Sequence, residues 1–159
     1  MKFADYRYVS RSTGDAGRGS EPADMSNKIL SPDNRPRVLI VEDEYLVAME
    51  AGAGLDDAGF DVVGNANCAA EAVRMAVDER PDLVIMDIRL VGVRDGVDAA
   101  VEIFETTGIR CLFVTAHQTP DVRARAQAAS PLGWLPKPYT PDALVLAVRG
   151  ALSRRELEG

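Results

Sequence analysis

The stretch that decides the fold is PDLVIMDIRL, residues 81–90. Its four consecutive apolar residues, 83–86, have no polar position between them, which is typical of a strand covered on both faces in a parallel sheet. Asp87 follows at once, and a carboxylate at the end of a buried strand needs a partner or a chemical task. The stretch therefore predicts an α/β fold with a functional carboxylate at one edge of its sheet.

Short apolar runs alternate with longer segments of helical period on both sides of this stretch. Five of each are expected, and this alternation builds βα units around a parallel sheet. The expected strands are 38–41, 61–64, 83–86, 111–115 and 133–135.

The helical segments carry one apolar stripe each and have clear start signals. Thr-Pro-Asp occurs at 119–121 and at 140–142, where it supplies a capping hydroxyl, a proline at the first helical position and an acid in the first turn. Gly52 and Gly54, within the first segment, cost on the order of 1 kcal/mol each relative to alanine. The stripes expected to be buried are Val47, Ala51, Leu55 and Ala58 in the first segment and Val97, Ala100, Val101 and Phe104 in the third.

The composition narrows the possible partners and the setting. The 159 residues include 18 basic and 25 acidic side chains, and the formal charge of −7 disfavours nucleic acid as a direct partner. No apolar run approaches the roughly 20 residues that span a bilayer, so no membrane association is expected. Cys68 and Cys111 show no spacing of a disulfide framework or zinc site, which favours a reducing, cytoplasmic location.

The chain divides into three parts. Residues 1–35 are rich in Gly, Pro, Ser and charge and lack an apolar period, which predicts a flexible N-terminal extension. Two alternatives stay open, namely that Met25 is the true start and that the aromatic residues at 3, 6 and 8 dock on a partner. Residues 36–155 form the expected domain and 156–159 a C-terminal tail, so a single domain without an output domain is expected.

Polar side chains follow four of the five expected strands. Because the carboxyl ends of parallel strands meet at one edge of a sheet, these side chains should converge. Three clustered carboxylates resist ionising together unless a cation lies among them, and oxygen ligands suit Mg²⁺. One carboxylate could then act as a nucleophile toward phosphorus while the lysine and the hydroxyl neutralise and orient the phosphoryl oxygens. The converging residues are Glu42, Asp43, Asp87, Thr115 and Lys137.

Each of these residues also has a plainer interpretation. Glu42 and Asp43 could cap the first helix, where acids favour the helix dipole. Thr115 could be an ordinary β-branched strand residue and Lys137 a turn residue. The joint placement of all five at strand ends favours a phosphoacceptor site.

Four segments together resemble the receiver domain of two-component response regulators. They are VLIVEDE (38–44), PDLVIMDIRL (81–90), VTA (114–116) and GWLPKPYTPDAL (133–144). The resemblance implies a flavodoxin-like, doubly wound sheet of five parallel strands in the order 2-1-3-4-5. It also implies that Asp87 accepts a phosphoryl group from a histidine kinase or a histidine phosphotransfer protein.

The resemblance further assigns a role to each site residue. Mg²⁺, or Mn²⁺ in its place, would bind Glu42, Asp43, Asp87 and the backbone carbonyl of Arg89. Thr115 and Lys137 would bind the phosphoryl group, and the bond between Lys137 and Pro138 is usually cis in the family. Thr115 and Trp134 would form the conformational switch, whereas Arg89 and His117 stand where the family tunes the lifetime of the phosphate.

Three departures from the family pattern bear on these roles. Trp134 stands where a Tyr or Phe is usual, so it is either a modified switch or a packing residue. Val91 replaces a common proline, and the loop before Gly96 is one residue longer than the commonest spacing. His117 has a second interpretation as a solvated loop residue.

Two classes of function remain open. In the first, phosphorylation of Asp87 alters binding to a downstream protein or to a second copy, for which a face with Arg123, Arg125 and Arg149 is a candidate. In the second, a receiver-shaped module sequesters a kinase without phosphorylation. An enzyme acting on an external substrate is disfavoured, because aspartyl-phosphate hydrolases generally place a second acid where Arg89 stands. A flavin site is disfavoured by the acidic first loop.

Overall fold

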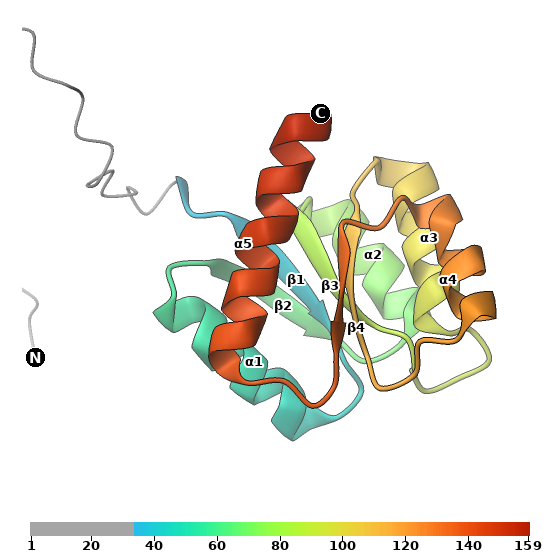
Figure 1. Ribbon diagram of the computed structural model, residues 1–159, viewed down its shortest axis with the longest axis horizontal. Helices are drawn as coiled ribbons and strands as arrows, with labels where there is room; N and C mark the ends of the chain where they lie inside the picture. The colour runs from blue at the N-terminus through green and yellow to red at the C-terminus, as the bar shows by residue number, and fades with distance from the viewer. Residues whose placement is uncertain (1–33) are drawn as a thin grey trace, which may run out of the picture.

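The computed structural model describes residues 34–159, which form a five-stranded parallel sheet flanked by helices (Figure 1). The strands follow the order β2-β1-β3-β4-β5, so the predicted fold class and strand order are confirmed. The predicted N-terminal extension lies, apart from residues 34 and 35, outside the described residues. The strands are β1 (Arg37–Val41), β2 (Asp61–Ala66), β3 (Leu83–Asp87), β4 (Cys111–Thr115) and β5 (Gly133–Pro136).

Helices cover both faces of the sheet (Figure 1). α1 (Tyr45–Asp57) and α5 (Pro141–Glu158) lie on one face, and α2 (Ala69–Glu79), α3 (Gly96–Thr107) and α4 (Pro120–Ala126) lie on the other. α4 continues into a 3₁₀ turn, Gln127–Ala129. α5 runs through most of the segment 156–159, which we expected to be a tail, and only Gly159 lies beyond it. Within residues 34–159, no helix is both long and apolar enough to cross a membrane.

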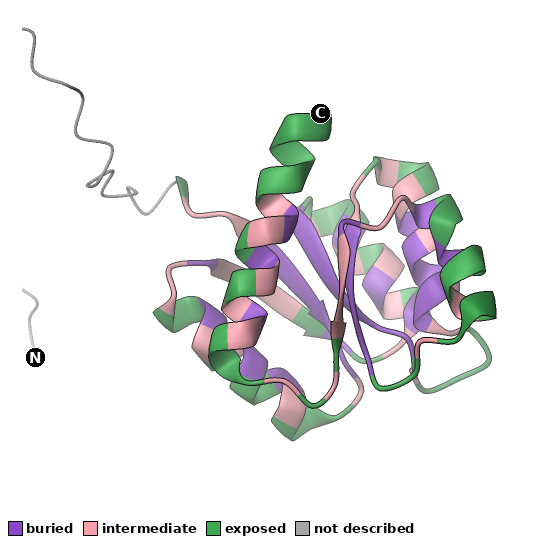
Figure 2. Cartoon of the chain, viewed as in Figure 1, coloured by how far each residue is buried: buried purple, intermediate pink, exposed green. Residues whose placement is uncertain are grey.

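Alternate side chains of the central strands enter two separate cores. Leu39 and Val41 of β1 pack beneath α2 and α3, whereas Val38 and Ile40 pack beneath α1 and α5. All residues of β3 and β4 are buried (Figure 2). Because these strands are covered on both faces, they need apolar residues at every position, which explains the unbroken apolar runs in the sequence.

The buried stripes of the helices differ in part from those expected from spacing. In α1 the structure buries Ala48 rather than Val47, together with Ala51 and Leu55. In α3 it buries Ile103, whereas Val101 and Phe104 are only half-buried. α3 is contacted by α2 on one side and by α4 and its 3₁₀ turn on the other, so its buried surface is wider than one stripe and is rotated from the predicted one.

The two predicted Thr-Pro-Asp starts are confirmed as helix caps. The Thr119 hydroxyl accepts the N–H of Val122 at 3.3 Å, and the Thr140 hydroxyl accepts the N–H of Ala143 at 3.2 Å. These caps begin α4 and α5 directly after the loops that leave β4 and β5. The carboxyl ends of β4 and β5 lie at the same edge of the sheet as the end of β3, because the three strands pair in parallel.

Candidate functional site

Three carboxylates meet at the carboxyl edge of the sheet. Glu42 and Asp43 follow β1, Asp87 ends β3, and each offers an oxygen within 4.8 Å of those of the other two. Glu42 and Asp87 are buried, with 4% and 8% of their surface exposed, and Asp43 is half-buried. The convergence predicted from the strand ends is therefore present.

Lys137, which directly follows β5, reaches into this acidic cluster. Its Nζ donates to Glu42 Oε1 at 2.7 Å and to Asp87 Oδ2 at 3.0 Å. The backbone N–H of Lys137 donates to the carbonyl of Thr115 at 3.0 Å, which ties the end of β5 to the end of β4. The peptide bond between Lys137 and Pro138 is cis, as the family resemblance implied.

Without a further cation, the cluster carries more negative than positive charge. Burial, and then the hydrogen bond with Asp87, raises the pKa of Glu42 to about 8, and Lys137 offsets only part of this rise. For Lys137, burial lowers the pKa, but the hydrogen bonds to Glu42 and Asp87 outweigh it and raise the pKa above its ordinary value. With all groups ionised, three carboxylates and one ammonium leave two negative charges in excess.

The donor set fits a small divalent cation. Glu42 Oε2 is buried and has no hydrogen-bond partner among the described residues. Buried polar atoms are rarely left without a partner, and carboxylate oxygens are the ligands that Mg²⁺ prefers. The residues that the sequence nominated for a metal thus stand where one could be held.

Thr115 and Arg89 lie beside the cluster in different ways. Thr115 is buried, and its hydroxyl accepts the N–H of His117 at 3.1 Å and donates to the carbonyl of the same residue at 3.4 Å. The backbone N–H of Arg89 donates to Asp87 Oδ1 at 3.3 Å, while the Arg89 side chain is exposed. The His117 side chain is also exposed, and its role in phosphate lifetime stays a prediction.

Two side chains contact the ring of Trp134 of β5. Its ring stacks on Phe113 with 4.7 Å between the ring centroids and an interplanar angle of 25°. The guanidinium of Arg123 in α4 lies 4.8 Å from the ring centroid. The half-buried indole therefore packs between the sheet and α4, which does not decide between the switch and the packing interpretation.

Sequence reasoning missed a backbone contact that fixes Asp87. Gly96, the first residue of α3, donates its N–H to the carbonyl of Ile88 at 2.8 Å. A Cβ at position 96 would lie 1.9 Å from the carbonyl oxygen of Asp87. A glycine at the end of the loop that follows β3 is the only sequence signal of this contact, and it was interpreted there only as a loop-length marker.

A groove of about 400 Å³ opens next to Lys137, between α1 and the beginning of α5. Val47, Tyr139 and Leu144 contribute apolar surface to its lining. Tyr45, Leu46 and Met49 of α1 are more than half exposed nearby in the chain. The sequence did not single out this surface.

Comparison with known proteins gives consistent matches over the folded part of the chain. Residues 38–149 match the response regulator receiver domain. The transcriptional regulatory protein PdtaR of Mycobacterium tuberculosis is 40% identical over 118 residues, which are 74% of this chain and 57% of PdtaR. The phyllosphere-induced regulator PhyR of Methylorubrum extorquens is 30% identical over 139 residues, 87% of this chain and 51% of PhyR. The chain thus spans little more than half the length of these two relatives.

The fold also matches solved structures. The signal receiver domain of a modulated diguanylate cyclase from Desulfovibrio desulfuricans G20 aligns with a TM-score of 0.72 and 37% identity, over 79% of this chain and 99% of that chain. A receiver domain protein from Methanospirillum hungatei aligns with the same TM-score at 23% identity, which supports the fold alone.

Proposed function

The chain belongs to the family of response regulator receiver domains, and from that premise we propose that Asp87 accepts a phosphoryl group in a Mg²⁺-dependent reaction. The donor is a phosphohistidine of a sensor histidine kinase or of a phosphotransfer protein. The modified domain then signals through contacts with other proteins, in the cytoplasm. The observation that carries this proposal is the convergence of Asp87 with Glu42, Asp43 and Lys137 at one edge of the sheet.

Asp87 is the residue of the cluster best placed to be the nucleophile. It ends a fully buried strand, and the N–H of Arg89 and the Nζ of Lys137 hold one of its oxygens each. A carboxylate oxygen attacks phosphorus as the bond from phosphorus to the histidine nitrogen breaks, and the freed imidazole takes up a proton from solvent. The product is an aspartyl phosphate, and hydrolysis of that bond restores the carboxylate.

Glu42, Asp43, Asp87 and the backbone carbonyl of Arg89 would hold the Mg²⁺, and Mn²⁺ offers the same charge for the same oxygen donors. When bound, the ion supplies positive charge that neutralises the phosphoryl oxygens and the neighbouring carboxylates. The unpartnered Oε2 of Glu42 supports this assignment.

Lys137 and Thr115 would receive the phosphoryl group. The ammonium of Lys137 already contacts Asp87, so it can shift from carboxylate to phosphoryl oxygen with little movement. The Thr115 hydroxyl, now engaged with the backbone of His117, would turn toward the phosphoryl group. Trp134, one strand away from Thr115, would report or follow that change, and Arg89 and His117 would modulate the access of water.

Two surfaces would carry the protein contacts. The exposed apolar residues Tyr45, Leu46 and Met49 lie at the beginning of α1, directly after the acidic pair, and offer a docking surface for the phosphodonor. The face formed by α4, β5 and α5 would bind the downstream protein or a second copy of the chain. Turnover is limited to the chain's own phosphoryl group.

The test is intact-protein mass spectrometry after incubation with acetyl phosphate. We expect one added phosphoryl group that requires Mg²⁺ and is lost in Asp87→Asn. Asp78→Asn, which changes an exposed aspartate on α2, is the matched control and should be labelled like the wild type. A wild-type chain that stays unlabelled by acetyl phosphate and by a phosphorylated kinase would instead favour the phosphorylation-independent binding module.

A further inference from the structure

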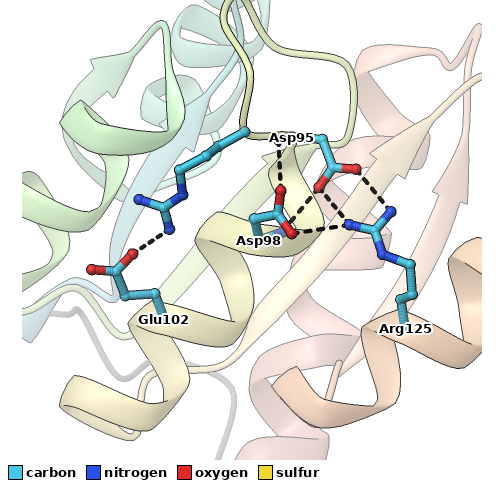
Figure 3. A network of polar contacts seen from close by, with 5 residues as sticks. Asp95, Asp98, Glu102 and Arg125 are labelled. Carbon is cyan, nitrogen blue, oxygen red and sulfur yellow. Dashed lines mark hydrogen bonds and ion pairs between the residues drawn. The ribbon is translucent and has the colours of Figure 1, made fainter.

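Arg125 of α4 holds the beginning of α3 through two carboxylates (Figure 3). Its Nη1 and Nη2 donate to the two oxygens of Asp95 at 2.9 and 3.1 Å, and Nη2 also donates to Asp98 Oδ1 at 3.0 Å. A planar guanidinium makes such paired contacts with a geometry that a lysine cannot reproduce. α4, a helix of only seven residues, is therefore fixed to one end of α3.

The two carboxylates are themselves locked in place as a helix cap. Asp95 Oδ1 accepts the N–H of Asp98 at 3.0 Å, and Asp98 Oδ2 accepts the N–H of Asp95 at 3.1 Å. Burial raises the pKa of Asp95, but the hydrogen bonds from Arg125 and the Asp98 N–H outweigh it and hold that pKa below its ordinary value. Arg125 thus binds a charged pair that the α3 backbone has already oriented.

The residue after Asp95 rests on the backbone of the phosphoacceptor. Gly96 donates its N–H to the carbonyl of Ile88, and there is no room for even a methyl group between Gly96 and the carbonyl of Asp87. A displacement of the α3 N-terminus toward β3 must therefore move the peptide that joins Asp87 to Ile88, and a displacement away from β3 stretches the hydrogen bond to Ile88. The N–H of Arg89, which bonds to the Asp87 carboxylate, lies one residue further along.

A second arginine ties α4 to the other side of the site. Arg123 lies over Trp134 of β5, three residues before Lys137. α4 is thus in contact with the strand that leads to Lys137 and, through Arg125, Asp95 and Gly96, with the strand that ends in Asp87. The short helix joins the two halves of the phosphoryl site.

We propose that Arg125 is a positioning residue for Asp87: by clamping α4 to Asp95 and Asp98 it fixes the backbone on which Gly96 and Asp87 meet. Its consequence for chemistry rests on the proposed function, because a looser clamp slows phosphorylation of Asp87. The contacts that join Arg125 to Asp87 are already present in the unphosphorylated chain, so they can be tested without phosphorylation.

The test compares Arg125→Lys with Arg94→Lys in the full chain. Arg94 pairs with Glu102 of α3 rather than with a residue of α4 and is about as exposed as Arg125, so it is the matched control. The hydrogen-exchange rate of the Gly96 amide is measured by NMR on the unphosphorylated protein and corrected for global stability by urea unfolding. This rate should rise about two- to fivefold in Arg125→Lys. It should not change in Arg94→Lys.

A second arm separates this proposal from the proposed function. Phosphorylation by acetyl phosphate should slow by a similar factor in Arg125→Lys, and the change should become smaller in an Asp95→Asn background, where the cap is kept and Arg125 retains only its ion pair with Asp98. Equal Gly96 exchange in Arg125→Lys and Arg94→Lys would overturn the role of Arg125, whether or not Asp87 is phosphorylated. Absent labelling of the wild type would contradict the proposed function, while the exchange result would still decide on Arg125.

Discussion

Gly96→Ala places a methyl group where the backbone of the phosphoacceptor lies. The new Cβ would stand 1.9 Å from the Asp87 oxygen and 2.8 Å from Ile88 Cα, whereas ordinary contacts begin at 3.4 Å. The contact must therefore open by about 1.5 Å, and both sides of it are backbone, which cannot turn away as a flexible side chain does.

The energetic cost follows from two losses. Overpacking of a tight contact costs about 1 to 3 kcal/mol, and the hydrogen bond from Gly96 to Ile88 contributes about 1 kcal/mol. Gly96→Ala should therefore lower the free energy of unfolding by about 2 to 4 kcal/mol. In the molecules that remain folded, misplacement of Asp87 by an ångström should slow phosphorylation by about 100-fold.

The assay is urea unfolding followed by Trp134 fluorescence, with Gly52→Ala as the control. Gly52 lies inside α1, and its Cβ would meet Ile40 Cδ1 at an ordinary 3.8 Å, so the same substitution should stabilise by about 0.5 to 1 kcal/mol. Gly96→Ala should lower the urea midpoint by about 1 to 2 M. Wild-type stability in Gly96→Ala, or equal losses in both variants, would refute the reasoning.

Three further predictions concern single residues. Arg80 ends α2 in the left-handed region at φ 48°, so Arg80→Gly should raise the free energy of unfolding by about 0.5 to 1 kcal/mol; an unchanged or lower urea midpoint would contradict this. Without divalent cations, folded Glu42 keeps its proton up to a pKa of about 8 whereas the unfolded chain releases it near 4.5, so stability should fall as the pH rises between these values. Glu42→Gln should remove this fall, and a loss of stability with rising pH that persists in the variant would contradict its assignment to Glu42. Lys137→Met removes the ammonium that competes with Mg²⁺ for the Glu42 and Asp87 oxygens. Mg²⁺ measured by calorimetry should therefore bind about 3- to 10-fold tighter, while phosphorylation of Asp87 slows. Weaker Mg²⁺ binding together with slower phosphorylation, or tighter binding together with faster phosphorylation, would be inconsistent with the two roles given to Lys137.

The fold could be predicted because its central strands are covered on both faces. The apolar runs at 83–86 and 111–115 carry this constraint directly, and the structure buries both. β2 was predicted too short, since its last residues include the exposed, polar Asn65, which pairs with Ile40 of β1. The buried stripe of α3 was misplaced toward Phe104 because spacing within one helix does not reveal that α2 and α4 flank it.

The site could be predicted as far as topology alone determines it. Parallel strands bring Glu42, Asp87 and Lys137 to one edge whatever the details of packing, so their proximity followed from the sequence. The pairing of Arg125 with Asp95 could not be predicted, since it joins residues on separate helices across an interface that only tertiary packing creates. For the same reason Gly96 was not predicted to touch Asp87.

The most direct test of the central claim is the position of a bound cation. Crystals of the full chain grown with Mn²⁺ would reveal the ion by its anomalous scattering. We predict a single strong peak in contact with carboxylate oxygens of Glu42, Asp43 and Asp87 and with the carbonyl of Arg89, and its loss in Asp43→Asn crystals. A strong peak elsewhere on the domain, or none at this edge of the sheet under saturating Mn²⁺, would contradict the account.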